Sequence, residues 1–309
     1  ASMPDTVITV TKANDGSKNV ISAVTVENTG NQDTSITVPS DAANYMDLSS
    51  LTTFADSLMK TADLKQYRIT GTINANMSII GIPINANIPM DFRLKLNADN
   101  TVQSAYINLD VPYFIGVLQQ DMTAKVYYED GVLYFDRNWE TSTGALWWKE
   151  YYDHHEYMKC TIDEFMANPM KYVYFCTNFT SMVENAINDA IAKSDQKAVR
   201  TGNIMFEEAL TGFNYNGSNQ WNVNLDAAHL INNSDFSDQM SITVGKGSNG
   251  ILNSISLSTR VLDMINLQLN NGQLVNADKS NVDMSVVPTG LSSNPNYVFG
   301  EVTVVETKK

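Results

Sequence analysis

Two adjacent stretches decide the fold: residues 67–79, YRITGTINANMSI, and residues 82–96, IPINANIPMDFRLKL. Apolar or small residues hold the odd positions of the first stretch and the even positions of the second. Side chains on a strand point alternately to opposite faces, so this period of two predicts a hairpin with one apolar and one polar face. At about 3.3 Å per residue each arm would exceed about 40 Å. We therefore predict a long, curved antiparallel sheet, with Pro83 and Pro89 at bends or at an edge.

Other stretches with the same alternation predict that strands continue on either side of this hairpin. Asp130-Gly131 predicts a tight turn between two alternating arms. Three short strands are expected within residues 1–45, at 6–10, 20–26 and 34–38. Further strands are expected at 101–111, 123–136, 212–231, 239–250, 251–261, 264–275, 281–287 and 296–308.

Two blocks of the chain have helical periodicity instead. In the first block an apolar stripe with steps of three and four predicts one helix, which Asp47 or Ser49 would cap. The second block contains a capping box at Thr161–Glu164 and a helix start at Asn168-Pro169. The two stripes are Leu48, Leu51, Phe54, Leu58 and Met59, and then Val173, Cys176, Thr180, Val183, Ile187 and Ile191.

A helical block followed by a meander occurs twice in this order, and no Pro/Gly/Ser-rich linker separates the two halves. This order indicates an α+β protein in which helices collect on the apolar face of one continuous antiparallel sheet. Two separate domains would also give the same order. We expect residues 1–45 to form a strand-rich extension and residues 46–309 to form a single domain.

Composition excludes several classes of protein. The chain has 309 residues and a formal net charge of −14, from 34 acidic and 20 basic residues. A field of that sign repels nucleic acid and anionic membrane surfaces, so we expect neither as a direct partner. No apolar run reaches the length of a membrane-spanning helix. We expect a monomer, with any secretion signal or lipid anchor outside this sequence.

Residues 145–160, ALWWKEYYDHHEYMKC, come closest to a chemical motif. Asp153, His154, His155, Glu156 and Cys160 are all metal-ligand types, but adjacent histidines point about 100° apart on a helix and to opposite faces of a strand. We therefore predict neither a metal nor a cofactor there. The stretch is better interpreted as a junction between the first meander and the second helical block. Its aromatic residues would cover the open sheet edge or the mouth of a cavity: Trp147, Trp148, Tyr151 and Tyr152.

Cysteine usage leaves two alternatives open. Cys160 and Cys176 are the only cysteines. They could form one disulfide in an oxidising compartment, or they could be two buried reduced thiols.

Four features of residues 46–290 are typical of one family: the paired meanders, the YYEDGVLYF hairpin with WWKEY after it, the helical insert and the segment GFNYNGSNQWNVNLDA. With these features the chain resembles the LolA-like half-barrel superfamily. The resemblance rests on strand pattern and spacing. It implies a half-barrel whose concave face packs helices and can hold acyl chains. It also implies a bacterial carrier or cell-surface lipoprotein.

The alternation itself gives the residues that would line such a concave face: Ile73, Met77, Ile84, Ile88, Met90 and Phe92. Our first hypothesis is a non-enzymatic, secreted or lipid-anchored protein of the bacterial cell envelope that binds a lipid or another apolar molecule. The second is a surface adhesion or carbohydrate-contacting module with a fully packed core. The third is a hydrolase with a carboxylate pair that the sequence does not reveal, because the fold and not the spacing along the chain places the two carboxylates.

Overall fold

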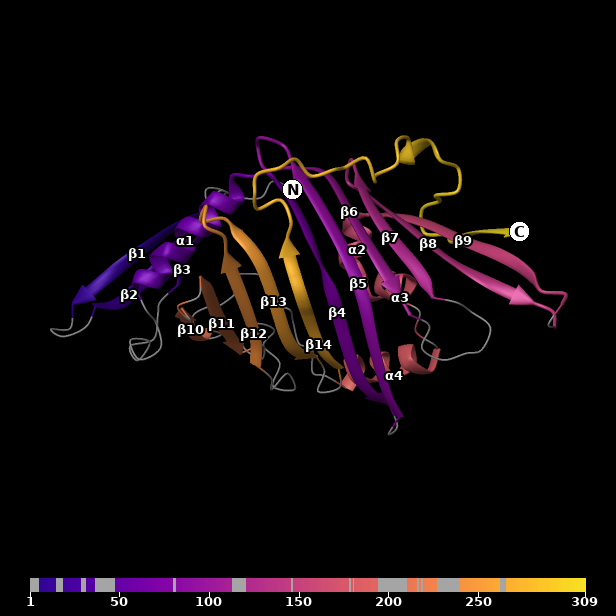
Figure 1. Ribbon diagram of the computed structural model, residues 1–309, viewed down its shortest axis with the longest axis horizontal. Coiled ribbons are helices and arrows are strands. Elements are labelled where there is room, and N and C mark those ends of the chain that lie inside the picture. Colours follow the sequence, from indigo (N-terminus) through magenta and orange to yellow (C-terminus); the bar gives the residue numbers. More distant parts are fainter. Residues whose placement is uncertain are drawn as a thin grey trace.

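The computed structural model describes residues 6–14, 19–28, 32–36, 48–79, 82–112, 121–145, 147–177, 179, 181–193, 210–215, 217, 219–226, 239–261 and 265–309. These residues form two sheets (Figure 1). A small sheet has the order β1-β2-β3, and a larger, open antiparallel sheet has twelve strands in the order β10-β11-β12-β13-β14-β4-β5-β6-β7-β8-β9-β15. No helix in this described part of the chain is long and apolar enough to cross a bilayer.

The strands are bounded as follows: β1 Thr6–Asn14, β2 Asn19–Asn28, β3 Gln32–Ile36, β4 Gln66–Ile79, β5 Ile82–Leu96, β6 Val102–Val111, β7 Met122–Glu129, β8 Val132–Thr143, β9 Glu150–Thr161, β10 Leu210–Tyr215, β11 Gln220–Asp226, β12 Gln239–Lys246, β13 Leu252–Val261, β14 Ile265–Leu274 and β15 Thr303–Lys308. The helices are α1 Leu48–Ala62, α2 Ile162–Ala167, α3 Pro169–Cys176 and α4 Ser181–Lys193, with a short 3-10 turn at Leu291–Ser293.

The long hairpin that the alternation predicts is confirmed as β4 and β5. Their register runs without a shift from Gln66 opposite Lys95 to Ile79 opposite Ile82. β6 pairs with β5 from Met90 onward, beyond both prolines of β5. The missing N–H groups of these prolines therefore cost no hydrogen bond to β6.

The turn between β7 and β8 is also confirmed. Asp130 and Gly131 have φ values of 49° and 82°. Two consecutive residues with positive φ make the tight turn whose twist suits a two-residue hairpin, and Asp-Gly is one of the few pairs that adopt it cheaply.

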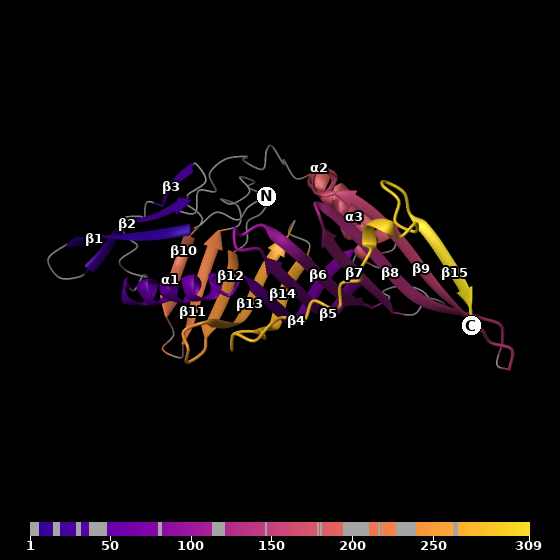
Figure 2. The same ribbon diagram turned by 90° about the horizontal axis from the view of Figure 1, so that it is seen from above.

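β14 joins the two halves of the chain into one sheet. It pairs with β4, from Ile265 opposite Met77 to Leu274 opposite Ile69. The strands of the first meander, β4 to β9, therefore lie on one side of this junction, and those of the second, β10 to β14, lie on the other (Figure 2).

Three helices pack on the same face of the large sheet, the face to which the apolar residues of β4 point. Phe54 and Leu58 of α1 pack in a cluster with Trp221, and α1 is tied to β13 because the Leu252 N–H donates to Thr61 Oγ1 (3.0 Å). The clusters under α3 and α4 contain Tyr172, Phe175, Cys176, Val183 and Ile187.

The helical stripes needed two corrections. Met59 is exposed, and on α3 the buried residues are Tyr172, Phe175 and Cys176, whereas Val173 is exposed. The second stripe also falls on two helices, because α3 ends at Cys176 and α4 begins at Ser181. The side chains of Leu48, Leu51 and Ile191, and all of Asp47 and Thr180, lie outside the described residues.

Helix starts in the second block agree better with the sequence. At α2 both halves of the capping box are present: Thr161 Oγ1 accepts from the Glu164 N–H, and the Glu164 carboxylate accepts from the Thr161 N–H. α3 begins with Pro169 at its first position, but the Asn168 side chain makes no capping hydrogen bond.

The opposite face of β6 to β9 is covered by the chain after β14. Leu291 and Tyr297 pack there with three strand tyrosines: Tyr106, Tyr127 and Tyr134. The strand expected at 281–287 is not formed; this segment is irregular, and its Val286 and Val287 pack on the same cluster. These two adjacent valines anchor the segment to a tyrosine-rich face of the sheet. The strand expected within 296–308 is confirmed as β15 at the edge of the sheet.

Candidate functional site

The sheet residues predicted to face a ligand share one face of β4 and β5, because residues directly opposite each other in an antiparallel pair point the same way. The register places them as Ile73 opposite Ile88, Met77 opposite Ile84, Met90 opposite Gly71 and Phe92 opposite Ile69.

Four of the six pack under the chain's own helices, and three of these four are buried. Met77 and Ile84 are each 5% exposed and pack with Val183 and Ile187 of α4. Ile88 is buried in the cluster that includes Tyr172 and Phe175 of α3, and Ile73 packs against that cluster. Helices of this protein therefore already fill the space above these four positions.

Ile73 is half-buried. The other two, Met90 and Phe92, are also half-buried, and they lie outside the clusters under α1, α3 and α4. They continue a row of half-buried apolar side chains across the same face. Met90 and Phe92 adjoin Ile107 of β6, and on the other side Leu269 of β14 lies opposite Leu257 of β13. We call these residues the central strip: Leu257, Leu269, Met90, Phe92 and Ile107.

Gly71 connects the two parts of the central strip. It lies in β4 between Leu269 and Met90, and a Cβ on it would lie 3.0 Å from Leu269 Cδ1 and 3.1 Å from the Asn270 carbonyl oxygen. The missing side chain leaves room for Leu269 Cδ1 above β4. The central strip is therefore continuous over five strands, between the cluster under α1 and the clusters under α3 and α4.

The four aromatic residues predicted to cover an edge or a cavity mouth are not near the central strip. Tyr151 and Tyr152 lie at the start of β9, and Trp147 and Trp148 lie in the turn between β8 and β9, where they are 85% and 75% exposed. β15 pairs with β9, so a strand and not these side chains lines that edge of β9.

The two histidines of the same stretch point to opposite faces of β9, as adjacent strand residues must. His154 stacks on Trp139 and lies 3.3 Å from the Glu306 carboxylate through Nδ1. His155 is on the other face, with Nδ1 2.9 Å from the Tyr157 hydroxyl. Among the residues that the structure describes, no group of three or more His, Cys, Asp or Glu side chains could hold a metal ion.

Cys160 and Cys176 are free thiols, both buried in the cluster under α3. Burial raises the pKa of the Cys160 thiol, and it raises the pKa of Cys176 to about 12. Both sulfurs therefore stay protonated and unreactive near neutral pH. The disulfide stays a prediction, which alkylation tests below.

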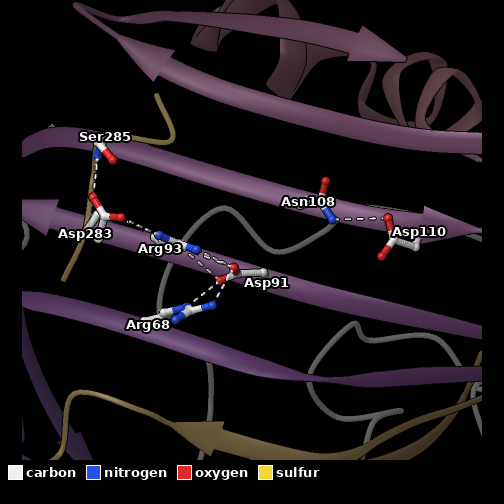
Figure 3. A network of polar contacts seen from close by, with 7 residues as sticks. All are labelled: Arg68, Asp91, Arg93, Asn108, Asp110, Asp283 and Ser285. Atoms are coloured by element: carbon white, nitrogen blue, oxygen red, sulfur yellow. Dashed lines mark hydrogen bonds and ion pairs between the residues drawn. The ribbon is translucent and has the colours of Figure 1, made fainter. Parts of the chain in front are cut away.

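The strongest polar network lies on the other face of the sheet (Figure 3). Asp91 of β5 accepts from Arg68 of β4, with Oδ2 2.9 Å from Nη2, and from Arg93, with Oδ2 2.8 Å from Nη2. Burial would raise the pKa of Asp91, but hydrogen bonds from the two guanidinium groups outweigh it and hold that pKa below its usual value.

Arg93 carries this network to the segment after β14. Its Nη1 donates to the Asp283 carbonyl oxygen at 2.6 Å, and the Ser285 N–H donates to the Asp283 carboxylate at 2.9 Å. The guanidinium also lies 5.6 Å from the centre of the Tyr106 ring. These contacts fasten the irregular segment to the sheet.

Sequence reasoning missed Leu257, Leu269 and Ile107, although it predicted strands through all three. Period two places each residue on an apolar face, but it does not say which strands are neighbours. The pairing of β14 with β4 brings Leu269 beside the predicted site. Neither a scan against protein-family models nor a search of curated proteins found a match for this chain.

Proposed function

We propose that this protein is a non-enzymatic carrier or receptor of the bacterial cell envelope, secreted or lipid-anchored, that binds a lipid or another apolar molecule on the concave face of a half-barrel. The observation that carries the proposal is the central strip. Its five residues stay half-buried, while Met77, Ile84 and Ile88 on the same face are buried under helices.

The dimensions of the central strip suit an extended apolar chain. It crosses five neighbouring strands, β13-β14-β4-β5-β6, which at about 4.8 Å between strands gives a row about 19 Å long. The lining is aliphatic, thioether and phenyl, and methionine adapts its shape to different apolar partners. Burying such side chains under a ligand contributes about 25 cal/mol per Å² of apolar surface removed from water.

A fluorescent fatty acid titrated into the purified protein tests the proposal. We expect saturable binding that unlabelled fatty acid displaces, and co-purified lipid by native mass spectrometry. Phe92→Ser, in the central strip, should weaken binding about tenfold or more. Asn85→Ser is the matched control, because Asn85 lies on the same strand with opposite parity and is exposed. A protein that binds no fatty acid, or equal binding by both variants, would refute the carrier function.

A second candidate function rests on the polar face of the same strands. Asn74 of β4 lies between Asn87 of β5 and Asn270 of β14; Asn74 Nδ2 donates to Asn87 Oδ1 (2.5 Å), and Asn270 Nδ2 donates to Asn74 Oδ1 (3.0 Å). This amide ladder is uncharged and partly exposed, which would suit contact with a neutral glycan. Binding of an oligosaccharide that Asn74→Ala abolishes, without fatty-acid binding, would favour this adhesion function.

A further inference from the structure

The hairpin of β8 and β9 extends past its neighbours in the sheet (Figure 1). β7 pairs with β8 up to Asn138, whereas β8 and β9 pair for five more residues, Trp139–Thr143. At about 3.3 Å per residue this extension is about 16 Å. On the other side, β15 pairs with β9 as far as Tyr152, and the Lys309 N–H donates to the Tyr151 carbonyl oxygen at 2.9 Å, so the hairpin passes β15 by less than it passes β7. The turn that follows Thr143 is therefore held out from the body of the sheet.

This turn is built to present two tryptophans. The Trp148 N–H donates to the Ala145 carbonyl oxygen at 2.8 Å, which closes a turn around Trp147. Gly144 has a φ of 96°, and a Cβ on it would lie 2.1 Å from the Trp148 carbonyl oxygen, so only glycine fits. The resulting exposures of 85% and 75% are the largest among the exposed large apolar side chains of the described residues.

The acids near the turn are all paired with lysines. Residues 144–149, GALWWK, contain no acidic residue. Below them, Glu150 lies 2.5 Å from Lys308, and Asp153 lies 2.8 Å from Lys309, which also pairs with Glu140. These three acids and two lysines leave one negative charge, which Lys149 of the turn offsets, whereas the chain as a whole carries a net charge of −14.

A convex, apolar tip with exposed tryptophans fits a lipid surface better than a glycan or a peptide. Tryptophan concentrates at membrane–water interfaces, where its ring is half in the apolar layer and its N–H stays in contact with water. Sites for small ligands are generally concave, and this tip is the end of a projecting hairpin. Because the whole chain is strongly acidic, anionic lipids would repel it.

We propose that the β8–β9 tip docks this protein on a zwitterionic lipid surface, with Trp147 and Trp148 inserted at the interface. The docking goes beyond the binding of an apolar ligand at the central strip and does not depend on it. It would place the hairpin against a membrane surface.

Flotation of the full chain with phosphatidylcholine vesicles tests the proposal. We expect binding that added salt leaves unchanged and that phosphatidylglycerol weakens. Trp147→Ala with Trp148→Ala should weaken binding about tenfold or more. Met166→Ala should not change it, since Met166 is an apolar side chain exposed to 69% on α2, away from the tip.

Tryptophan fluorescence gives a second, independent readout. The other two tryptophans are Trp139, stacked on His154, and Trp221, which is fully buried. Vesicles should therefore shift the emission of the tip tryptophans to shorter wavelength, and brominated phosphatidylcholine should quench it. Both effects should be absent in the double variant.

Three results would overturn the docking: no association with phosphatidylcholine, equal association by the double variant, or stronger association with phosphatidylglycerol that salt abolishes. An emission shift caused by a soluble oligosaccharide and not by vesicles would also overturn it. Because none of these assays contains a fatty acid, their failure is distinct from failure of the ligand-binding proposal.

Discussion

Two methionines on the same sheet face offer a direct test of the difference between packed core and central strip. Met77 of β4 is 5% exposed under α4, whereas Met90 of the neighbouring β5 is half-buried. Truncating a fully buried Met to Ala costs about 2–5 kcal/mol, because apolar contacts are lost and a cavity is left. We therefore expect about 3 kcal/mol for Met77→Ala. A side chain that keeps part of its contact with water loses less, and we expect about 1 kcal/mol for Met90→Ala.

Urea unfolding followed by far-UV circular dichroism measures the two free energies of unfolding. Adding a saturating fatty acid sharpens the comparison, because a ligand that binds the folded state stabilises it by an amount that rises with the logarithm of ligand concentration over Kd. The ligand should raise the stability of Met77→Ala as much as that of the unmodified protein, and should raise that of Met90→Ala by less. Equal destabilisation by the two substitutions, with no ligand effect, would mean that the central strip is ordinary core.

Three further predictions concern the thiols, the arginine network and the turns. Without reductant, neither cysteine should react with iodoacetamide in the folded protein at pH 8, since burial raises the pKa of Cys176 to about 12. Both cysteines should react once urea unfolds the protein. No reaction in urea, with a mass about 2 Da below that of the reduced protein, would show the disulfide instead. Arg93→Met should lower the free energy of unfolding by about 2–3 kcal/mol, because it leaves Asp91 with fewer donors. The pKa of Asp91 is lower in the folded state than in the unfolded state, so the Asp91 carboxylate stabilises the folded protein fully above the unfolded pKa of about 3.9. This stabilisation is lost as the pH falls through the folded pKa. The unfolding free energies of the two proteins should therefore converge at low pH, and parallel curves would contradict this. Gly144→Ala should disrupt the turn between β8 and β9 and speed hydrogen exchange of the local amides. Gly131→Ala, with open space around its Cβ, should lower the free energy of unfolding by only about 1 kcal/mol. Equal effects of the two substitutions would contradict the clash at Gly144.

The strands were predictable because period two is a local property. The pattern from Tyr67 to Leu96 gives both arms of the hairpin, and Asp130-Gly131 gives the turn between β7 and β8. Helix starts were predictable for the same reason, since the capping box at Thr161 needs residues only three apart. Each of these signals is complete within a few residues of sequence.

What the sequence did not show depends on contacts between distant segments. Nothing local to Leu269 indicates that β14 adds to β4. Similarly, Val282, Met284 and Val286 alternate as in a strand, but the segment is irregular, and its Val286 and Val287 pack on tyrosines of β6, β7 and β8. The predicted ligand-facing set was therefore divided in two by helices whose positions follow from tertiary packing alone.

The place of β4 in the sheet has a consequence for synthesis of the protein. β4 is the first strand of the large sheet to be made, yet it is an interior strand, and its partner β14 comes only after residues 80–264. Until then one edge of β4 offers unpaired N–H and C=O groups along a strand with an apolar face, which is a template for aggregation. Hairpins β4 to β9 can form early from neighbouring residues, but the sheet can be completed only late. The nascent chain therefore has a long interval in which a chaperone that shields this edge would raise the yield of folded protein.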